Sequence, residues 1–253
     1  MSKSDPRLEA FGRLLNIMDD LREKCPWDRE QTIESIRHLT IEETYELSDA
    51  ILDNDMAEIE KELGDLALHL VFYSKIASET NAFDITSVLN GICEKLIRRH
   101  PHIYGDVQVD GADQVKQNWE QIKQKESKGK KSVLSGVPKS MPSLVKAMRM
   151  QEKAAQVGFD WPDKSLVWDK VEEELQEFKE ADNSEKPSEF GDVLFSLVNY
   201  ARWHDINPDD ALELTNRKFK NRFETIERVA KEQGRELKSL TLEEMEEIWQ
   251  QAK

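Results

Sequence analysis

The sequence predicts an all-α protein made of two tandem helical repeats. Apolar residues recur at helical spacing in successive segments, and most of these segments begin at a residue type that caps helices. The 253 residues include only 10 Gly and 8 Pro, which favours helices over a turn-rich β fold. A pattern of roughly 100 residues occurs twice, and no segment shows a convincing strand pattern.

The first helices are defined by their start and stop signals. Asp5-Pro6 begins one helix with a capping side chain and a proline in the first turn. Cys25-Pro26-Trp27-Asp28 ends that helix, and an amphipathic helix is expected from about 32 to 52. Asp53-Asn54-Asp55 then marks a turn.

Two further helices complete the first predicted domain, residues 1–105. Asp55, with Glu58 three residues later, predicts a capping box for a helix that continues to about residue 79. Asp84 caps the next helix, which Pro101 ends because the residue before a proline disfavours helical backbone.

Residues 106–140 are predicted to be a linker region, and residues 141–253 a second helical domain. Gly, Ser, Pro and Lys are frequent in the linker, where a short helix is expected at 112–125. We interpret its basic run at 126–132 as a solvated hinge rather than a nucleic-acid patch. In the second domain, helices are expected at 144–157, 168–181, 184–204 and 208–232, with a last one behind a Thr241–Glu244 capping box.

Composition and charge exclude several classes of partner. The net charge of −15 argues against nucleic-acid and acidic-membrane binding, because the field of the protein repels phosphates. Cys25 and Cys93 match no metal or redox spacing and are expected to be buried free thiols in a reducing compartment. The longest apolar stretch, at 66–73, is too short for a membrane span, and the N-terminus lacks a signal core. We therefore expect a cytoplasmic protein with no membrane partner.

The same carboxylate pattern occurs in both repeats. Glu42-Glu43-x-x-Glu46 precedes Glu62-x-x-Asp65, and Glu173-Glu174-x-x-Glu177 precedes Glu189-x-x-Asp192. Residues three apart share a helix face, and each pair of half-motifs is centred on a turn signal. Two helices that fold back about this turn would bring four carboxylates to one level.

Clustered carboxylates of this kind predict a cation site. Four acids repel one another, and their burial is costly unless a cation pairs them. Oxygen ligands suit Mg²⁺, with Mn²⁺ as a substitute, and Mg²⁺ commonly accompanies a phosphate substrate. A lone Glu-x-x-Glu is usually a solvated helix face, but the duplication and the symmetry favour metal binding. The predicted ligands are Glu174, Glu177, Glu189 and Asp192 in the second repeat, and Glu43, Glu46, Glu62 and Asp65 in the first.

A pair of basic residues recurs in both repeats, and one amide occurs only in the second. Lys95 with Arg99, and Lys218 with Arg222, lie four apart on the helix after each acidic hairpin, where they are candidate phosphate contacts. The alternative for each pair is an ordinary cation pair near a helix C-terminus. Seven residues beyond Asp192 stands Asn199, whereas Phe72 stands seven beyond Asp65. A polar amide suits a ligand site and Phe suits packing, so the second repeat is the better candidate for catalysis.

These residues together resemble the MazG family of nucleoside triphosphate pyrophosphohydrolases over nearly the whole chain. The motifs that carry the resemblance are Cys25-Pro26-Trp27-Asp28, Glu62-Leu63-Gly64-Asp65, Arg98-Arg99-His100-Pro101-His102, Val171-Glu172-Glu173-Glu174-Leu175, Glu189-Phe190-Gly191-Asp192 and Lys218-Phe219. The resemblance implies four-helix-bundle-type domains, a homodimer, and Mg²⁺-dependent hydrolysis of NTPs to NMP and pyrophosphate. It also implies that the C-terminal copy carries most of the catalytic activity.

The resemblance assigns roles by position. Glu174, Glu177, Glu189 and Asp192 would hold the metal, Lys218 and Arg222 would clamp the phosphates, and Lys170 and Trp249 would make weaker substrate contacts. Glu173 or Glu174 would orient or deprotonate the attacking water, while Lys218 and Arg222 stabilise the leaving pyrophosphate. The spacing from Glu177 to Glu189 is four residues shorter than that from Glu46 to Glu62, which leaves base preference open.

Three alternatives remain open from the sequence. The first is a phosphatase that releases orthophosphate, and the second is a hydrolase restricted to one nucleotide such as dUTP. The third is a non-catalytic nucleotide-binding regulator or interaction module, a role that also suits the first repeat. The substrate expected in the main interpretation is a nucleoside triphosphate.

Overall fold

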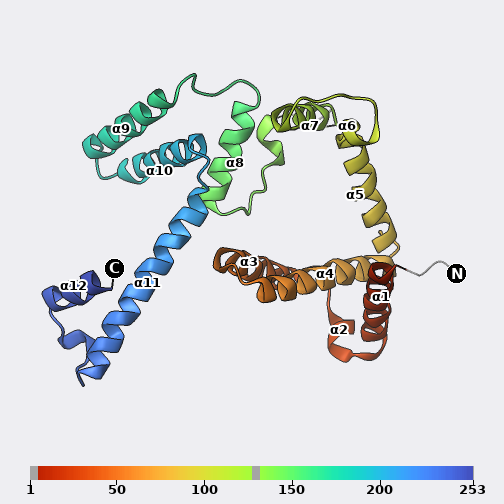
Figure 1. Ribbon diagram of the computed structural model, residues 1–253, viewed down its shortest axis with the longest axis horizontal. Coiled ribbons are helices and arrows are strands. Elements are labelled where there is room, and N and C mark those ends of the chain that lie inside the picture. Colours follow the sequence, from red (N-terminus) through yellow and green to blue (C-terminus); the bar gives the residue numbers. More distant parts are fainter. Residues whose placement is uncertain (1–4, 127–131, 253) are drawn as a thin grey trace. The chain divides into compact units, whose positions relative to one another are not determined.

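The computed structural model describes residues 5–126 and 132–252, and every regular element in those ranges is a helix. The chain divides into two compact units, residues 1–124 and 125–253. The division lies inside the predicted linker, whose basic run at 126–132 is mostly outside the described residues. The linker assignment stays a prediction, whereas the all-α fold is confirmed (Figure 1).

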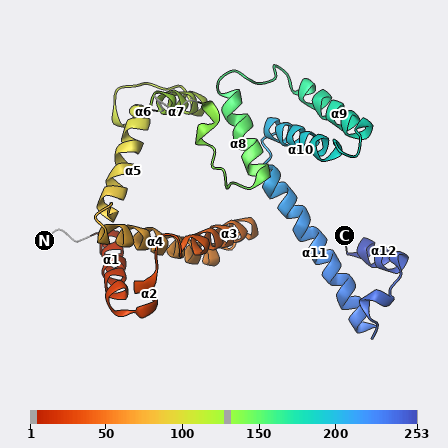
Figure 2. The same cartoon turned by 180° about the vertical axis from the view of Figure 1, so that it is seen from behind.

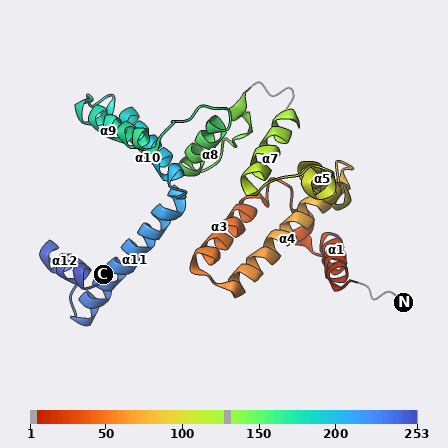
Figure 3. The ribbon, with the colours of Figure 1, turned by 45° about the horizontal axis from the view of Figure 1, so that its top comes forward.

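The N-terminal unit is centred on an antiparallel helical hairpin, α3 (Arg37–Asp53) and α4 (Met56–Glu79) (Figure 3). Helix α1 (Pro6–Lys24) packs against α4 and is followed by the short α2 (Pro26–Glu30). After α4 come α5 (Ile85–Arg99), α6 (Pro101–Tyr104) and α7 (Ala112–Glu126). A core of Met18, Ile36, Val71 and Phe72 joins α1 to the hairpin.

The turn of this hairpin follows from its three polar residues. Asn54 adopts the left-handed conformation with φ of 55°, which Asn tolerates better than most residues. The Asp55 carboxylate then accepts hydrogen bonds from the backbone N–H groups of Ala57 and Glu58 at 3.1 Å each. The predicted N-cap is confirmed, but the Glu58 carboxylate accepts from Lys61 Nζ instead of completing the box.

The C-terminal unit places one helix between two others. Its elements are a 3-10 turn η1 (Val133–Gly136), α8 (Ser143–Ala155), α9 (Lys164–Glu180), α10 (Lys186–Trp203), α11 (Pro208–Glu232), a 3-10 turn η2 (Leu237–Ser239) and α12 (Leu242–Gln251). Helix α10 contacts both α9 and α8. Helix α11 leads away from them, and α12 folds back against it (Figures 1 and 2).

Local hydrogen bonds explain where helix boundaries differ from the prediction. Helix α3 begins at Arg37, later than expected, because Thr32 and Ser35 exchange side-chain-to-backbone hydrogen bonds that hold a turn. Helix α9 begins at Lys164, earlier than expected, because Asp163 accepts from Ser165 N at 2.8 Å as an N-cap. The Thr241–Glu244 capping box is confirmed.

Two further sequence expectations concern thiols and membrane spans. Both cysteines are free, as expected, but Cys93 is exposed and Cys25 only half-buried, so their predicted burial was wrong. Cys93 lies on α5, whose backbone is close to α4 and α6 and whose last residue meets Trp119 of α7, so much of the surface of this helix stays uncovered. In the described ranges, no helix is both long and apolar enough to cross a membrane.

Candidate functional site

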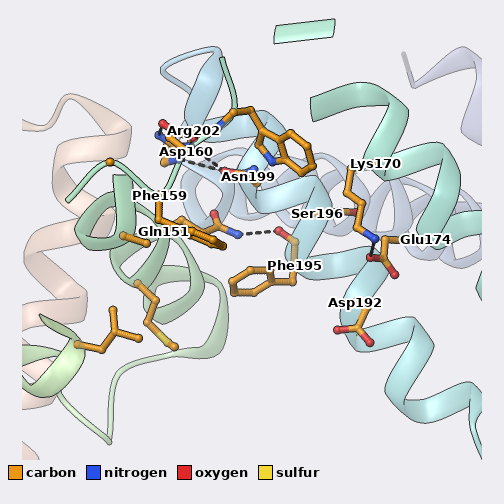
Figure 4. Close-up of a pocket in the computed structure, with 15 residues that line it drawn as sticks. Gln151, Phe159, Asp160, Lys170, Glu174, Asp192, Phe195, Ser196, Asn199 and Arg202 are labelled. Atoms are coloured by element: carbon orange, nitrogen blue, oxygen red, sulfur yellow. Dashed lines mark hydrogen bonds and ion pairs between the residues drawn. The ribbon is translucent and has the colours of Figure 1, made fainter. Parts of the chain in front are cut away.

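The second hairpin brings three of its predicted ligands together. Glu174 and Glu177 on α9 and Glu189 on α10 each offer a carboxylate oxygen, and these oxygens lie within 4.8 Å of one another. Glu174 is 8% exposed, so its charge is largely removed from water. Asp192, one turn further along α10, lies outside this group but lines the adjoining cavity beside Glu174 (Figure 4).

A lysine partly neutralises this cluster. Lys170 Nζ lies 2.8 Å from Glu173 Oε1 and 2.8 Å from Glu174 Oε1. Hydrogen bonds to these two carboxylates raise the pKa of Lys170, which keeps its ammonium charged. Partial desolvation and the charge of Glu174 raise the pKa of Glu177. The cluster therefore holds more negative charge than Lys170 compensates, which favours a further cation.

The first hairpin contains an equivalent cluster. Oxygens of Glu43 on α3 and of Glu62 and Asp65 on α4 lie within 4.8 Å of one another, and Glu46 lies outside the group. Burial and the close approach of the Glu62 and Asp65 carboxylates raise the pKa of Glu43 to about 7. The hydrogen bond from Lys61, 2.8 Å long, lowers the pKa of Glu62.

The environment of Glu62 indicates whether the first cluster would suit a metal ion. Its side chain is fully buried, and Oε2 has no hydrogen-bond partner among the described residues, although Oε1 accepts from Lys61. A buried carboxylate oxygen without a partner is costly, and a bound cation would satisfy it. Both oxygen-only donor sets fit a hard divalent cation such as Mg²⁺.

A cavity of about 520 Å³ adjoins the second cluster and lies entirely within the C-terminal unit. This volume is in the range of small-molecule sites in proteins. Lys170, Glu174 and Asp192 line one part, and Gln151, Phe159 and Phe195 line another (Figure 4). Its remaining lining residues are Leu134, Met150, Ala154, Gly158, Asp160, Trp161, Ser196, Asn199 and Arg202.

An ion pair fixes the loop that precedes α9 to the cavity wall. Arg202 donates to Asp160 at 3.0 and 2.5 Å, and its Nε and Nη2 donate to Asn199 Oδ1 at 3.1 and 2.9 Å. Burial is the largest single influence and acts to raise the pKa of Asp160. The hydrogen bonds and charge of Arg202, together with hydrogen bonds from the Trp161 backbone and the Trp203 side chain, outweigh it, so the net pKa is lowered. Asn199 is therefore held in one orientation at the cavity.

A glycine turn presents one aromatic wall of the cavity. Gly158 has φ of +88°, and the backbone N–H of Phe159 donates to Ala154 O at 3.0 Å, which closes the end of α8. Phe159 is 82% exposed and still lines the cavity. The chain thus leaves α8 with an aromatic ring placed beside the cavity instead of in the core.

The predicted phosphate contacts lie elsewhere in the unit. Lys218 and Arg222 are on α11, and α11 does not contact α9 in the part of the chain that is described. The Arg222 guanidinium lies 5.4 Å from the Trp249 ring centroid, so the Arg–Trp pair joins α11 to α12. Within one chain, these residues are not gathered with the acids.

The N-terminal unit contains a matching pair that sequence reasoning missed. Arg99, at the end of α5 with Lys95 one turn earlier, lies 5.2 Å from the centroid of Trp119 on α7. The recurrence of a Trp after each Lys–Arg pair was the available signal. Gln151 and Arg202 were also missed, because neither belongs to a repeated motif.

These features define a class: an all-helical protein with a carboxylate centre beside a small-molecule cavity. A profile of the MazG nucleotide pyrophosphohydrolase domain matches residues 31–104. The chain is 42% identical to the nucleoside triphosphate pyrophosphohydrolase of Escherichia coli (strain K12), over 97% of this chain and 98% of that protein. It is 44% identical to the nucleoside triphosphate pyrophosphohydrolase/pyrophosphatase MazG of Thermotoga maritima, over 96% of this chain and 95% of that protein.

A solved structure is also similar to part of the chain. The crystal structure of a mazG-related protein from Thermotoga maritima matches 45% of this chain and 98% of its own, with 26% identity and a TM-score of 0.41. The near full-length identity to the two curated relatives shows that the chain belongs to the MazG family.

Proposed function

We propose that this chain is a Mg²⁺-dependent hydrolase that cleaves nucleoside triphosphates at the α–β linkage, giving nucleoside monophosphate and pyrophosphate. The names of the curated relatives support this activity. The single observation that carries the location is the 520 Å³ cavity, which Glu174 of the second acidic cluster also lines. The C-terminal copy is therefore the proposed catalytic centre, and its substrates include ribo- and deoxyribonucleotides.

The metal would be held by Glu174, Glu177 and Glu189, with Asp192 next to them on the cavity wall. When bound, Mg²⁺ supplies charge that neutralises the triphosphate and polarises the α–β linkage. Glu173 lies outside the three-acid group, with its carboxylate on Lys170, so a bound metal would leave it as the candidate base that orients the attacking water. Lys170 lines the cavity and offers its ammonium to a phosphate oxygen.

We also propose that the chain acts as a homodimer. Phe190, Leu194 and Leu197 on α10 are each at least 40% exposed, which leaves an apolar face of the hairpin uncovered within one copy. A four-helix bundle formed by two copies would cover this face. Lys218 and Arg222 would then bind phosphate at an assembled site, with Trp249 beside them. Sedimentation of the purified protein as a monomer at micromolar concentration would contradict this.

The N-terminal copy is proposed as a second metal site, with Glu43, Glu46, Glu62 and Asp65 as ligands and Lys95 and Arg99 as phosphate contacts. The buried, unpartnered Oε2 of Glu62 supports metal binding there. Metal binding without turnover is the role proposed for this copy, because its position equivalent to Asn199 is the core residue Phe72.

Phosphorus NMR of the protein with Mg²⁺ and a mixture of NTPs tests the reaction. Pyrophosphate and NMP are expected, and both should disappear with EDTA and in Glu174→Gln. Orthophosphate with NDP would overturn the assigned cleavage. Cleavage of a single nucleotide such as dUTP would overturn the broad substrate range, and no product would favour a regulatory role.

A further inference from the structure

Gln151 on α8 is a buried amide whose orientation is fixed. It is 8% exposed, and its Nε2 donates to the backbone carbonyl of Phe195 on α10 at 2.8 Å. A carbonyl oxygen only accepts hydrogen bonds, so the amide nitrogen and not the oxygen must face Phe195. The Oε1 atom is thereby directed elsewhere.

This Oε1 atom has no partner among the described residues, although it is buried. Buried polar atoms are almost always hydrogen-bonded, and an unpaired one is costly. Gln151 lines the same cavity as Glu174 and Asp192 (Figure 4). Oε1 itself has almost no accessible surface, so a ligand N–H group would reach it with a small shift of the amide, and the hydrogen bond formed would then satisfy this acceptor.

The surroundings of Gln151 are suited to a flat, uncharged group. Phe159 and Phe195 lie near Gln151 in Figure 4, and Met150 and Ala154, from the same helix as Gln151, add apolar lining to the cavity. The Arg202 charge is paired with Asp160. The carboxylates and Lys170 lie on the other side of Phe195 in Figure 4, where a triphosphate and its metal would be placed.

We infer that Gln151 recognises the nucleobase, with Oε1 accepting a hydrogen bond from an N–H group on the base edge. The inference rests on the proposed function and adds the residue that recognises the nucleobase. Asn199, whose Oδ1 is occupied by Arg202, has only its amide N–H groups left to offer the cavity, so it complements Gln151 as a donor. Phe159 and Phe195 supply apolar surface to the ring.

The test compares ATP with purine riboside triphosphate, which has the same ring system but no N–H group on its base edge. The wild-type protein should cleave ATP with a kcat/KM roughly tenfold or more above that of the analogue, since a site built for a donor rejects a base that lacks one. Gln151→Leu should lose this preference through a higher KM for ATP, while kcat/KM for the analogue stays within about twofold.

The control is Gln156→Leu, the same change at an exposed position at the end of the same helix. It should keep the wild-type preference, and thermal melting should confirm that both variants are folded. An unchanged ATP-to-analogue ratio in Gln151→Leu would overturn the inference while leaving the hydrolase assignment intact. If the wild-type protein cleaves no NTP, the proposed function fails and this inference fails with it.

Discussion

The two acidic hairpins carry the same carboxylates but differ in what surrounds them. Four residues before the first clustered glutamate, the C-terminal copy has Lys170 and the N-terminal copy has Leu39. Seven residues after the last aspartate, the C-terminal copy has Asn199 and the N-terminal copy has Phe72. Lys170 and Asn199 line the cavity, whereas Phe72 belongs to the core and Leu39 packs against it.

The comparison separates metal binding from substrate binding. Both hairpins retain three converging carboxylates, because the turn-centred spacing is sufficient to bring them together. At the two positions compared, the residues of the C-terminal copy are polar and line a cavity, so they would give a phosphate chain partners there, whereas those of the N-terminal copy are apolar. A duplicated metal motif is therefore weak evidence for duplicated catalysis.

The largest expected effect on activity comes from removing a carboxylate of the C-terminal copy, and the matching removal in the N-terminal copy is its comparison. Glu174→Gln should lower pyrophosphate release by ~100-fold or more, because it removes a proposed metal ligand and leaves Lys170 without one partner. Glu43→Gln should lower it less than about threefold if the N-terminal copy does not turn over. Steady-state pyrophosphate assays on the two variants check this, and equal losses would refute the division of roles.

The next effect is on stability and concerns Phe72. It is 3% exposed in the core cluster, so Phe72→Asn should lower the free energy of unfolding by about 3–5 kcal/mol through lost packing and a buried amide. Urea unfolding measures this. The exposed Phe83 supplies the control, since Phe83→Asn should change stability by less than about 1 kcal/mol. A small effect at Phe72 would mean that the N-terminal copy tolerates a polar pocket.

Lys170→Leu makes the C-terminal copy resemble the N-terminal one at this position. We expect a roughly tenfold lower kcat/KM, because one charge-assisted hydrogen bond to the substrate is lost. Lys164→Leu, at the exposed start of the same helix, should not alter kcat/KM. If Lys170→Leu were as active as the wild type, Lys170 would serve only to neutralise Glu173 and Glu174 in the free protein.

The smallest effect concerns α12, which closes the C-terminal unit. Arg235 donates to Glu244 at 2.7 and 3.0 Å, and this pair lowers the pKa of Glu244 to about 2. A carboxyl whose pKa is lower in the folded state stabilises the fold above its unfolded pKa of 4.5, and this contribution is lost as the pH falls towards 2.

Thermal melting of Glu244→Gln against the wild type checks this from pH 7 to 2. The Tm difference should be largest above pH 4.5 and shrink to nothing near pH 2. Glu246→Gln, on an exposed position of the same helix, should show no such window. A Tm difference that does not vary with pH would refute the contribution of this ion pair.

Sequence reasoning succeeded where local geometry decides the outcome. Caps at Asp5, Asp55 and Thr241 fix helix starts through bonds within three residues, so they are readable from the chain. The convergence of Glu174, Glu177 and Glu189 follows from helix periodicity and a short turn.

The rest of the site depends on contacts between distant residues. Gln151 is oriented by Phe195, 44 positions away, and nothing in the local pattern marks it as polar core. The displacement of Lys218 and Arg222 from the acids depends on the direction in which α11 leaves α10, which residue spacing does not encode. Such features follow from tertiary packing, and a single sequence does not specify them.

The backbone conformation at Gly158 restricts the stereochemistry of any residue that could replace this glycine. An added Cβ would meet no atom within 4 Å, so crowding does not exclude other residues. With φ of +88°, however, an L-residue is strained and a D-residue is not. D-alanine introduced there by chemical synthesis should preserve the position of Phe159, and L-alanine should shift it. The wall of the cavity at Phe159 thus depends on the stereochemistry that the backbone at position 158 accepts.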